Sequence, residues 1–331
     1  MPAATTAKLQ YVDDSRPGLS RRWRYKTWHY FRPDGDRVTE KPEIKRLNGL
    51  AVPPAYEDVW FCLMPNGHLQ ATGRDEKGRK QYRYHPDYRA QREADKFSRT
   101  AAFGEALPAI REQVEADLRR TALSRERMLA ATVRLLDVGT IRIGNSGYAK
   151  RNDTRGATTL TDDDVDVRGE SLYLDFTAKG GKVRKLRVED GSLARLARRV
   201  HDELPGQHLF AYEDEDGDPH TVSSGEVNDY IRAAMGEDFT AKHFRTWHAS
   251  ALAYREINAS DGRLTLKAML TPVAEKLGNT IAISRKSYVH PALIECVKAD
   301  GCLGHAGLKL PRATTYLAPY ERGLIDFLSA D

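Results

Sequence analysis

Three short segments in the C-terminal half of the chain contain a tyrosine, an arginine and an asparagine among other polar residues. They are 242–250 (KHFRTWHAS), 278–280 (GNT) and 284–291 (SRKSYVHP). A phenol can act as a nucleophile, and a guanidinium can bind two phosphate oxygens with parallel hydrogen bonds. A tyrosine beside basic residues is usually structural, so the interpretation of Tyr288 depends on the residues that accompany it.

These segments resemble the C-terminal catalytic motifs of type IB DNA topoisomerases of the poxvirus and bacterial kind. In that family a K-x-x-R-T-[YW] helix carries a phosphate-binding arginine, and an R-K-S-Y-like helix carries the attacking tyrosine. Arg245 and Tyr288 occupy those positions here. Asn279 corresponds to a position that holds histidine or asparagine in the family. The resemblance implies that Tyr288 is the nucleophile and that the other two residues bind phosphate.

Two upstream motifs extend the resemblance in the expected order. The segment 135–145 (LLDVGTIRIGN) is similar to the helix that bears the family's first arginine, which corresponds to Arg142. The segment 176–182 (FTAKGGK) is similar to the β-turn that bears the catalytic lysine, which corresponds to Lys179. The order Arg, Lys, Arg, Asn, Tyr is complete, and five motifs in order are far more specific than any one of them.

The implied reaction is attack by Tyr288 on a DNA phosphodiester, which leaves a 3′-phosphotyrosyl link that the free 5′ hydroxyl later reverses. Arginines meet the negative charge that develops on the phosphate, and Lys179 is suited to protonate the leaving oxygen. The sequence does not identify the base that activates the tyrosine. No G-x-x-x-x-G-K-[ST] motif is present, so we expect no nucleotide cofactor, no metal and no other cofactor.

The resemblance also reaches residues 44–59 and 70–86, which are similar to the family's DNA-facing N-terminal lobe. It implies a two-lobed clamp around duplex DNA that works as a monomer. Our candidates for DNA contacts are Arg74, Arg79, Lys80, Tyr82 and Arg83. An ordinary charged loop and strand is the alternative for each of them. Because most contacts should be to phosphate, we expect binding to weaken steeply with salt.

Two other functions fit part of the pattern. A site-specific tyrosine recombinase shares the catalytic scaffold, but such enzymes usually have a histidine three residues before the second arginine, where this chain has Lys242. Such enzymes also use an all-helical N-terminal domain, whereas the first domain of this chain is expected to be mainly β. The second alternative is a DNA-binding module without activity, which the intact set of motif residues argues against.

The pattern of residues predicts an α+β fold with two domains. Residues 1–90 are expected to form a small, mainly β domain, with strands at 25–31, 58–63, 68–72 and 80–84 and a short helix after Pro42. Residues 91–331 are expected to form a larger, mainly α domain, in which apolar residues recur every three or four positions. The resemblance implies that the first domain clamps DNA and that the second is a catalytic domain of the tyrosine recombinase and topoisomerase IB scaffold. A three-stranded β meander at 165–167, 172–176 and 183–188 interrupts these helices.

Charge is distributed unequally along the chain. Residues 1–99 hold 20 Lys and Arg against 13 Asp and Glu, whereas the rest is slightly acidic. A basic lobe attracts polyanions, although a solvated surface is the simpler alternative. The acidic run Asp162–Asp166 predicts a solvated hairpin edge, with a metal site as a less favoured reading.

Cysteine usage and hydropathy indicate the compartment. Cys62, Cys296 and Cys302 are odd in number and lack metal-ligand spacing, so we expect reduced, partly buried thiols. The opening residues are polar, and no apolar run is long enough to cross a bilayer. We therefore expect a cytoplasmic protein with no membrane partner. The resemblance further implies a bacterial enzyme that associates with the nucleoid.

Overall fold

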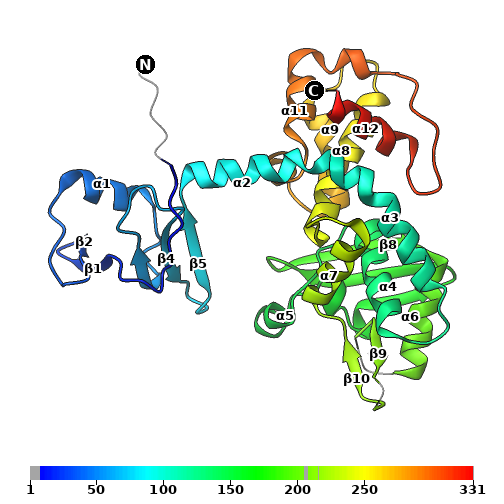
Figure 1. The fold of residues 1–331 in the computed structure, drawn as a ribbon, viewed down its shortest axis with the longest axis horizontal. Helices are drawn as coiled ribbons and strands as arrows, with labels where there is room; N and C mark the ends of the chain where they lie inside the picture. Colours follow the sequence, from blue (N-terminus) through cyan, green and yellow to red (C-terminus); the bar gives the residue numbers. More distant parts are fainter. Residues whose placement is uncertain (1–7, 205–207, 215, 331) are drawn as a thin grey trace. The chain divides into compact units, whose positions relative to one another are not determined.

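A computed structural model describes residues 8–204, 208–214 and 216–330. The polar opening segment therefore lies outside the described residues, apart from its last member, Lys8. The chain divides into two compact units, Met1–Lys96 and Phe97–Asp331. The predicted boundary at residue 90 falls inside helix α2 (Pro86–Ser98), which contains the division between the units (Figure 1).

The N-terminal unit contains a two-stranded and a three-stranded antiparallel sheet. The hairpin is β1 (Ser20–Arg24) with β2 (Thr27–Phe31), and the sheet has the order β3 (Glu57–Phe61), β4 (Leu69–Arg74), β5 (Lys80–Tyr84). Helix α1 (Lys41–Gly49) begins beside Pro42, as predicted. Its Leu47 packs with Leu19, Tyr30 and Phe61 in a small core.

One strand prediction in this unit is wrong at its start. We expected extended chain from Tyr25 to Phe31, but Tyr25 and Lys26 have φ of 50° and 62° and form the turn of the β1–β2 hairpin. Positive φ at two successive residues is the geometry of a type I′ turn, which usually selects asparagine or glycine. The residues at this turn gave no such signal, and the first strand was missed for the same reason.

The C-terminal unit is mainly helical, and its core is formed by the apolar faces of these helices. The helices are α3 (Thr100–Leu118), α4 (Arg125–Gly139), α5 (Ser146–Asn152), α6 (Gly191–Glu203), α7 (Ser224–Met235), α8 (Ala241–Asn258), α9 (Leu266–Leu277), α10 (Ile281–Ser287), α11 (Pro291–Asp300) and α12 (Pro319–Ser329). A capping box opens α7, in which the Ser223 hydroxyl accepts from the Glu226 N–H and the Glu226 carboxylate accepts from the Ser223 N–H. The short hairpin of β9 (Ala211–Glu213) and β10 (Pro219–Thr221) was not predicted.

The predicted meander is confirmed as β6 (Val165–Arg168), β7 (Ser171–Ala178) and β8 (Lys182–Glu189). Helices α4 and α6 pack against it (Figure 1). Leu172, Leu174 and Phe176 of β7 belong to the core of the unit. At the β7–β8 turn, Gly180 and Gly181 have φ of 85° and 74°, which residues with a β-carbon rarely adopt.

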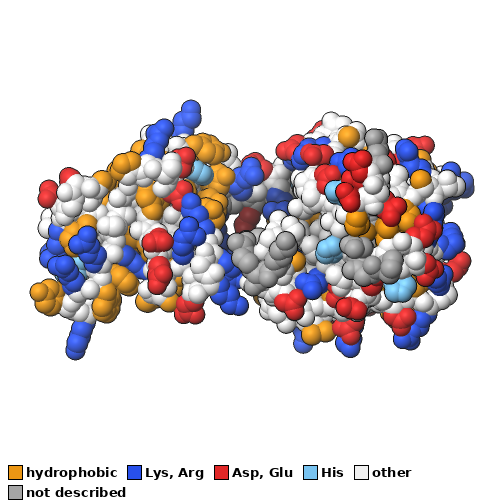
Figure 2. Space-filling view, turned by 90° about the horizontal axis from the view of Figure 1, so that it is seen from below, with side chains coloured by type: hydrophobic (Ala, Val, Ile, Leu, Met, Phe, Trp, Pro, Cys, Tyr) orange, Lys and Arg blue, Asp and Glu red, His pale blue; other side chains and the backbone are white. Residues whose placement is uncertain are grey.

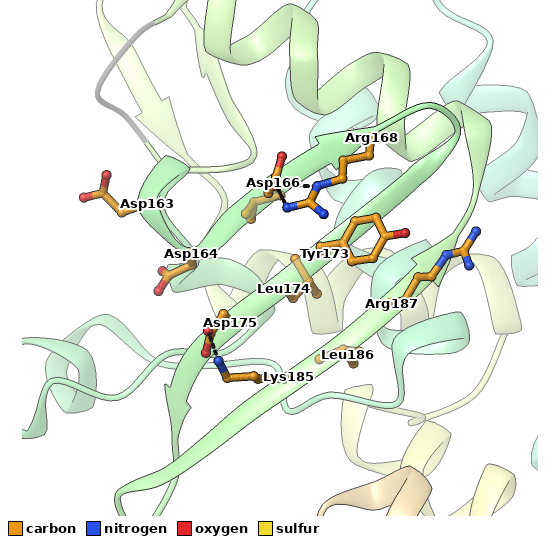
Figure 3. A pocket seen from close by; sticks show the side chains of 11 residues that line it. Asp163, Asp164, Asp166, Arg168, Tyr173, Leu174, Asp175, Lys185, Leu186 and Arg187 are labelled. Atoms are coloured by element: carbon orange, nitrogen blue, oxygen red, sulfur yellow. Dashed lines mark hydrogen bonds and ion pairs between the residues drawn. The ribbon is translucent and has the colours of Figure 1, made fainter.

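The acidic run lies mostly outside the sheet. Residues Asp162–Asp164 form a 3-10 turn, and Asp166 is in β6. Figure 3 shows the exposed side of the sheet, where Asp166 pairs with Arg168 at 2.6 Å and Asp175 pairs with Lys185 at 2.8 Å. The charges on this side are therefore partly neutralised by neighbours. Within the described residues, no group of three or more His, Cys, Asp or Glu side chains is placed to hold a metal ion.

The expectation of three reduced cysteines is wrong for two of them. Cys296 and Cys302 form a disulfide, while Cys62 is free and buried. Helix α11 ends in a left-handed turn at Gly301 and Cys302, with φ of 73° and 62°. This turn brings the two Cα atoms to 4.8 Å, within the range that a disulfide spans. A spacing of six residues gave no hint of that reversal.

None of the described helices combines the length and the apolar character needed to cross a membrane.

Candidate active site

The end of α4 positions Arg142. Thr140 ends the helix in the left-handed conformation, with φ of 51° and ψ of 24°, and redirects the chain. Two residues later, the half-buried Arg142 guanidinium donates to Asn279 Oδ1 at 3.2 Å and to the Tyr288 hydroxyl at 3.4 Å. Three of the residues predicted from the motifs are therefore in direct contact.

Arg245 projects from α8 and is almost fully buried, with 4% of its surface exposed. It donates to the carbonyl oxygens of Thr140 and, at 3.0 Å, of Leu277. Its Cζ lies 5.0 Å from the centre of the Tyr288 ring. Burial and the charge of Arg142 lower the pKa of Arg245 to about 10, so the guanidinium remains charged at neutral pH. Its buried Nε has no hydrogen-bond partner among the residues that the structure describes.

Asn279 follows the C-terminal turn of α9. Gly278 has φ of 62° and caps the helix in the left-handed conformation. The Asn279 backbone N–H then donates to Ala274 O at 2.9 Å, which fixes the side chain beside Arg142. Its amide nitrogen Nδ2 is buried and, within the described part of the chain, lacks an acceptor. That donor can serve a ligand.

Tyr288 lies directly after α10, where its backbone N–H donates to Ser284 O at 3.1 Å. Ser250 of α8 supports the segment, because its hydroxyl oxygen accepts from the His290 N–H at 3.0 Å while its proton is directed to Thr246 O at 3.0 Å, with Tyr288 O further away at 3.4 Å. Burial by itself would raise the pKa of the Tyr288 phenol. The charges of Arg245 and Arg142 outweigh burial and hold this pKa below its ordinary value. We call Arg142, Arg245, Asn279 and Tyr288 the Tyr288 cluster.

Lys179 is the one predicted catalytic residue that the structure does not bring into contact with this cluster. It begins the β7–β8 turn, and its side chain is exposed. It makes no hydrogen bond or ion pair with any described residue. The adjoining glycines leave the turn with few steric restraints.

A buried ion-pair network supports α4, which precedes Arg142, and α8, which carries Arg245. Arg111 of α3 contacts Asp137 of α4 at 2.8 Å and Glu321 of α12 at 2.9 Å. His248 of α8 lies 2.7 Å from Asp137, and the Trp247 indole donates to Glu321 at 3.1 Å. Burial would raise the pKa of Asp137, but Arg111 and His248 hold it well below its usual range. This network was not predicted from the sequence, because its members are far apart in the chain.

Arg184 of β8 was also not predicted from the sequence. It donates to the carbonyl oxygens of Glu275 and Lys276 at the end of α9. The sequence does contain an indication that Arg184 needs a partner. Alternation along β8 places Arg184 on the same side of the strand as Leu186 and the buried Val188, where an arginine needs a partner.

The predicted DNA-contact residues lie together on β4, β5 and the connection between them. Arg74 and Lys80 pair with acidic neighbours, as does Arg79, while Arg83 donates to Ala51 O at 3.3 Å. Tyr82 is 47% exposed and stacks on Tyr84. Figure 2 shows basic and apolar side chains next to one another on one face of this unit. The role of these residues in binding DNA stays a prediction.

Comparisons with known proteins cover both units. A family described as "Eukaryotic DNA topoisomerase I, catalytic core" matches residues 85–293, and "Bacterial DNA topoisomerase IB, N-terminal domain" matches residues 27–75. DNA topoisomerase 1B of Acanthamoeba polyphaga mimivirus is 30% identical over 275 residues, covering 79% of this chain and 81% of that protein. The vaccinia virus (strain Copenhagen) enzyme is 21% identical over 245 residues, covering 73% and 76%.

Among solved structures, the XerH site-specific recombinase bound to its difH substrate aligns with a TM-score of 0.38 at 16% identity, covering 59% of this chain and 52% of that one. The family matches and the mimivirus relative are more specific. The chain belongs to the type IB DNA topoisomerase family.

Proposed function

We propose that this enzyme relaxes supercoiled DNA by transient cleavage of one strand, with Tyr288 as the nucleophile. The observation that carries the proposal is the contact of the Tyr288 hydroxyl with Arg142 at 3.4 Å, beside the buried guanidinium of Arg245. The two positive charges favour loss of the phenol proton, because they stabilise the phenolate more than burial destabilises it.

In the proposed step, Tyr288 Oη forms a bond to phosphorus and the bond from phosphorus to the 5′ oxygen breaks. The nonbridging oxygens gain negative charge, which Arg142 and Arg245 meet with guanidinium N–H groups already in place. The unsatisfied Nδ2 of Asn279 supplies a neutral donor. The product is a 3′-phosphotyrosyl link, which stores the energy of the broken bond. Attack by the 5′ hydroxyl reverses the step without ATP.

The leaving 5′ oxygen is strongly basic and needs a proton as the bond breaks, and we assign that proton to Lys179. An exposed ammonium on a glycine-rich turn can reach a bound strand and act as a general acid. We infer that bound DNA brings Lys179 to the reaction, since no contact within the described chain does so. The base that accepts the Tyr288 proton is left unassigned.

We propose that the N-terminal unit adds affinity through phosphate contacts from β4 and β5, with limited sequence preference. Arg74, Arg79, Lys80, Tyr82 and Arg83 are its candidates. A monomer suffices for swivelling a nicked duplex, and neither a metal nor a nucleotide has an assigned role. We place the activity in the cytoplasm, on the DNA of the nucleoid.

The proposal is tested by incubating the protein with supercoiled plasmid in excess EDTA and without ATP. We expect a ladder of relaxed, closed topoisomers. Tyr288→Phe should abolish both relaxation and the covalent protein–DNA adduct on a denaturing gel, while plasmid retardation on a native gel persists. An adduct formed by Tyr288→Phe would remove Tyr288 from its role. An unchanged plasmid with the wild-type protein at every salt concentration would overturn the proposal.

A further inference from the structure

Arg184 is the second residue to consider on the hairpin that carries Lys179. In the β7–β8 register Ala178 faces Lys182, Thr177 faces Val183 and Phe176 faces Arg184. Arg184 therefore lies near the turn, on the strand that leads away from it. The turn itself is glycine-rich and exposed, so whatever fixes the strands just below it also limits where Lys179 can move.

The partners of Arg184 are the last carbonyl groups of α9. Its guanidinium donates to Glu275 O at 3.1 Å and also to Lys276 O. Carbonyls in the last turn of a helix have no partner within the helix and carry partial negative charge, so a cation there is favourable. The next carbonyl, of Leu277, accepts from Arg245 at 3.0 Å. The end of α9 is thus shared by the β8 strand and the Tyr288 cluster.

Gly278 lies directly against the Arg184 guanidinium. A β-carbon at this position would collide with Arg184 Nη1, and the φ of 62° also favours glycine. Asn279 follows immediately and contacts Arg142. The distance along the chain from the Arg184 contact to the Tyr288 cluster is therefore only a few residues.

Electrostatic interactions also connect Arg184 with the Tyr288 cluster. The pKa of Arg184 is lowered by burial and by the charge of Arg142, and Arg184 in turn contributes to the lowered pKa of Arg245. Three guanidinium groups thus lie close enough to repel one another. A bound phosphate would relieve that repulsion, which places Arg184 at the border of the substrate site and not on a remote surface.

We propose that Arg184 is a positioning residue for Lys179: by tying β8 to the end of α9, it holds the base of the Lys179 turn beside the Tyr288 cluster. This inference rests on the proposed role of Lys179 as general acid. Arg184 does not transfer the proton itself. Without it, the Tyr288 cluster can still bind phosphate, but the lysine is delivered to the leaving oxygen less often.

The test separates protonation of the leaving group from every other step. The cleavage site is first mapped from the wild-type covalent adduct, and two duplexes are then made with oxygen or sulfur at the 5′ bridging position. A thiolate is a much weaker base than an alkoxide and leaves without protonation. We expect Lys179→Ala and Arg184→Ala to slow cleavage of the oxygen duplex at least ten-fold more than cleavage of the sulfur duplex, in single-turnover assays on denaturing gels.

Two further variants complete the experiment. Arg187→Ala removes the same side chain from the exposed side of β8, where it lies over Tyr173, and should leave both rates unchanged (Figure 3). Arg184→Lys keeps a positive charge but cannot hold two carbonyls in the same fork. Arg184→Lys should again slow cleavage of the oxygen duplex more than cleavage of the sulfur duplex. If Arg184→Ala fails to fold, Arg184→Lys is measured in its place.

Each outcome is decisive. If the Arg184 variants slow both duplexes equally while Lys179→Ala prefers sulfur, the positioning role is overturned and the proposed function stands. If Lys179→Ala itself shows no preference for sulfur, the general-acid assignment is wrong and the inference falls with it. A preference for sulfur in both sets of variants, absent from Arg187→Ala, supports the inference.

Discussion

The Tyr288 cluster and the Lys179 turn belong to the same unit but differ in how far their geometry is set before DNA binds. The cluster is half-buried to buried, and its members contact one another or the carbonyls at the ends of α4 and α9. Lys179 is exposed on a turn with two glycines at positive φ. We infer from this contrast that the groups that stabilise negative charge are in place before DNA binds. The proposed proton donor, Lys179, is positioned by the bound DNA.

Among variants that keep Tyr288, the largest effect is expected from removing the proposed proton donor. Lys179→Ala should slow cleavage of ordinary DNA by about 10²- to 10⁴-fold, the usual contribution of a general acid. Because the side chain is exposed, the melting temperature should stay unchanged in a thermal denaturation experiment. A large fall in melting temperature would show that the turn is part of the folded core, and the contrast between the two regions would be lost.

A somewhat smaller loss is expected within the Tyr288 cluster. Arg142→Ala should slow cleavage by roughly 10²- to 10³-fold, as for one preorganised donor to a developing charge. Unlike Lys179→Ala, it should slow oxygen- and sulfur-bridged duplexes alike, because charge on the phosphate develops with either leaving group. Single-turnover rates on the two duplexes give the measurement, and a selective loss on the oxygen duplex would assign Arg142 to the leaving group instead.

The smallest expected effect is a change in the pH at which Tyr288 titrates. The pKa of Tyr288 lies below the ordinary value of 10.0, so the folded protein releases this proton at a lower pH than the unfolded chain does. The phenolate therefore adds stability that is fully present above the unfolded pKa and is lost as pH falls through the folded one. Ultraviolet difference titration of wild type against Tyr288→Phe should isolate this group. Arg142→Ala should move its midpoint upward, and Lys179→Ala should not.

Local signals in the sequence predicted much of this arrangement. Strand β5 (Lys80–Tyr84), the meander and the Gly278 cap follow from alternation, turn residues and helix punctuation, each of which acts within a few residues. Motif order also indicated residues that prove to be neighbours, since Arg142, Asn279 and Tyr288 are in contact across more than a hundred positions of the chain.

Features that have no local signal, or that depend on distant partners, could not be predicted from the sequence. The β1–β2 hairpin turns on Tyr25 and Lys26, which carry no turn signal. The disulfide of Cys296 with Cys302 depends on a reversal after α11. Arg184 finds its partners on a helix about ninety positions away. The place of Lys179 during the reaction depends on the substrate, so neither the sequence nor the protein alone fixes it.

Thr140 has a consequence for how this enzyme can vary through evolution. It adopts φ of 51°, its hydroxyl donates to Lys276 O at 3.1 Å, and its carbonyl accepts from Arg245. Threonine is β-branched, as valine is, so both are strained at positive φ, whereas glycine would accept this backbone conformation but lose the hydroxyl. The hydroxyl contact with Lys276 O is therefore kept together with backbone strain, and substitution by glycine, which removes the strain, also removes that contact.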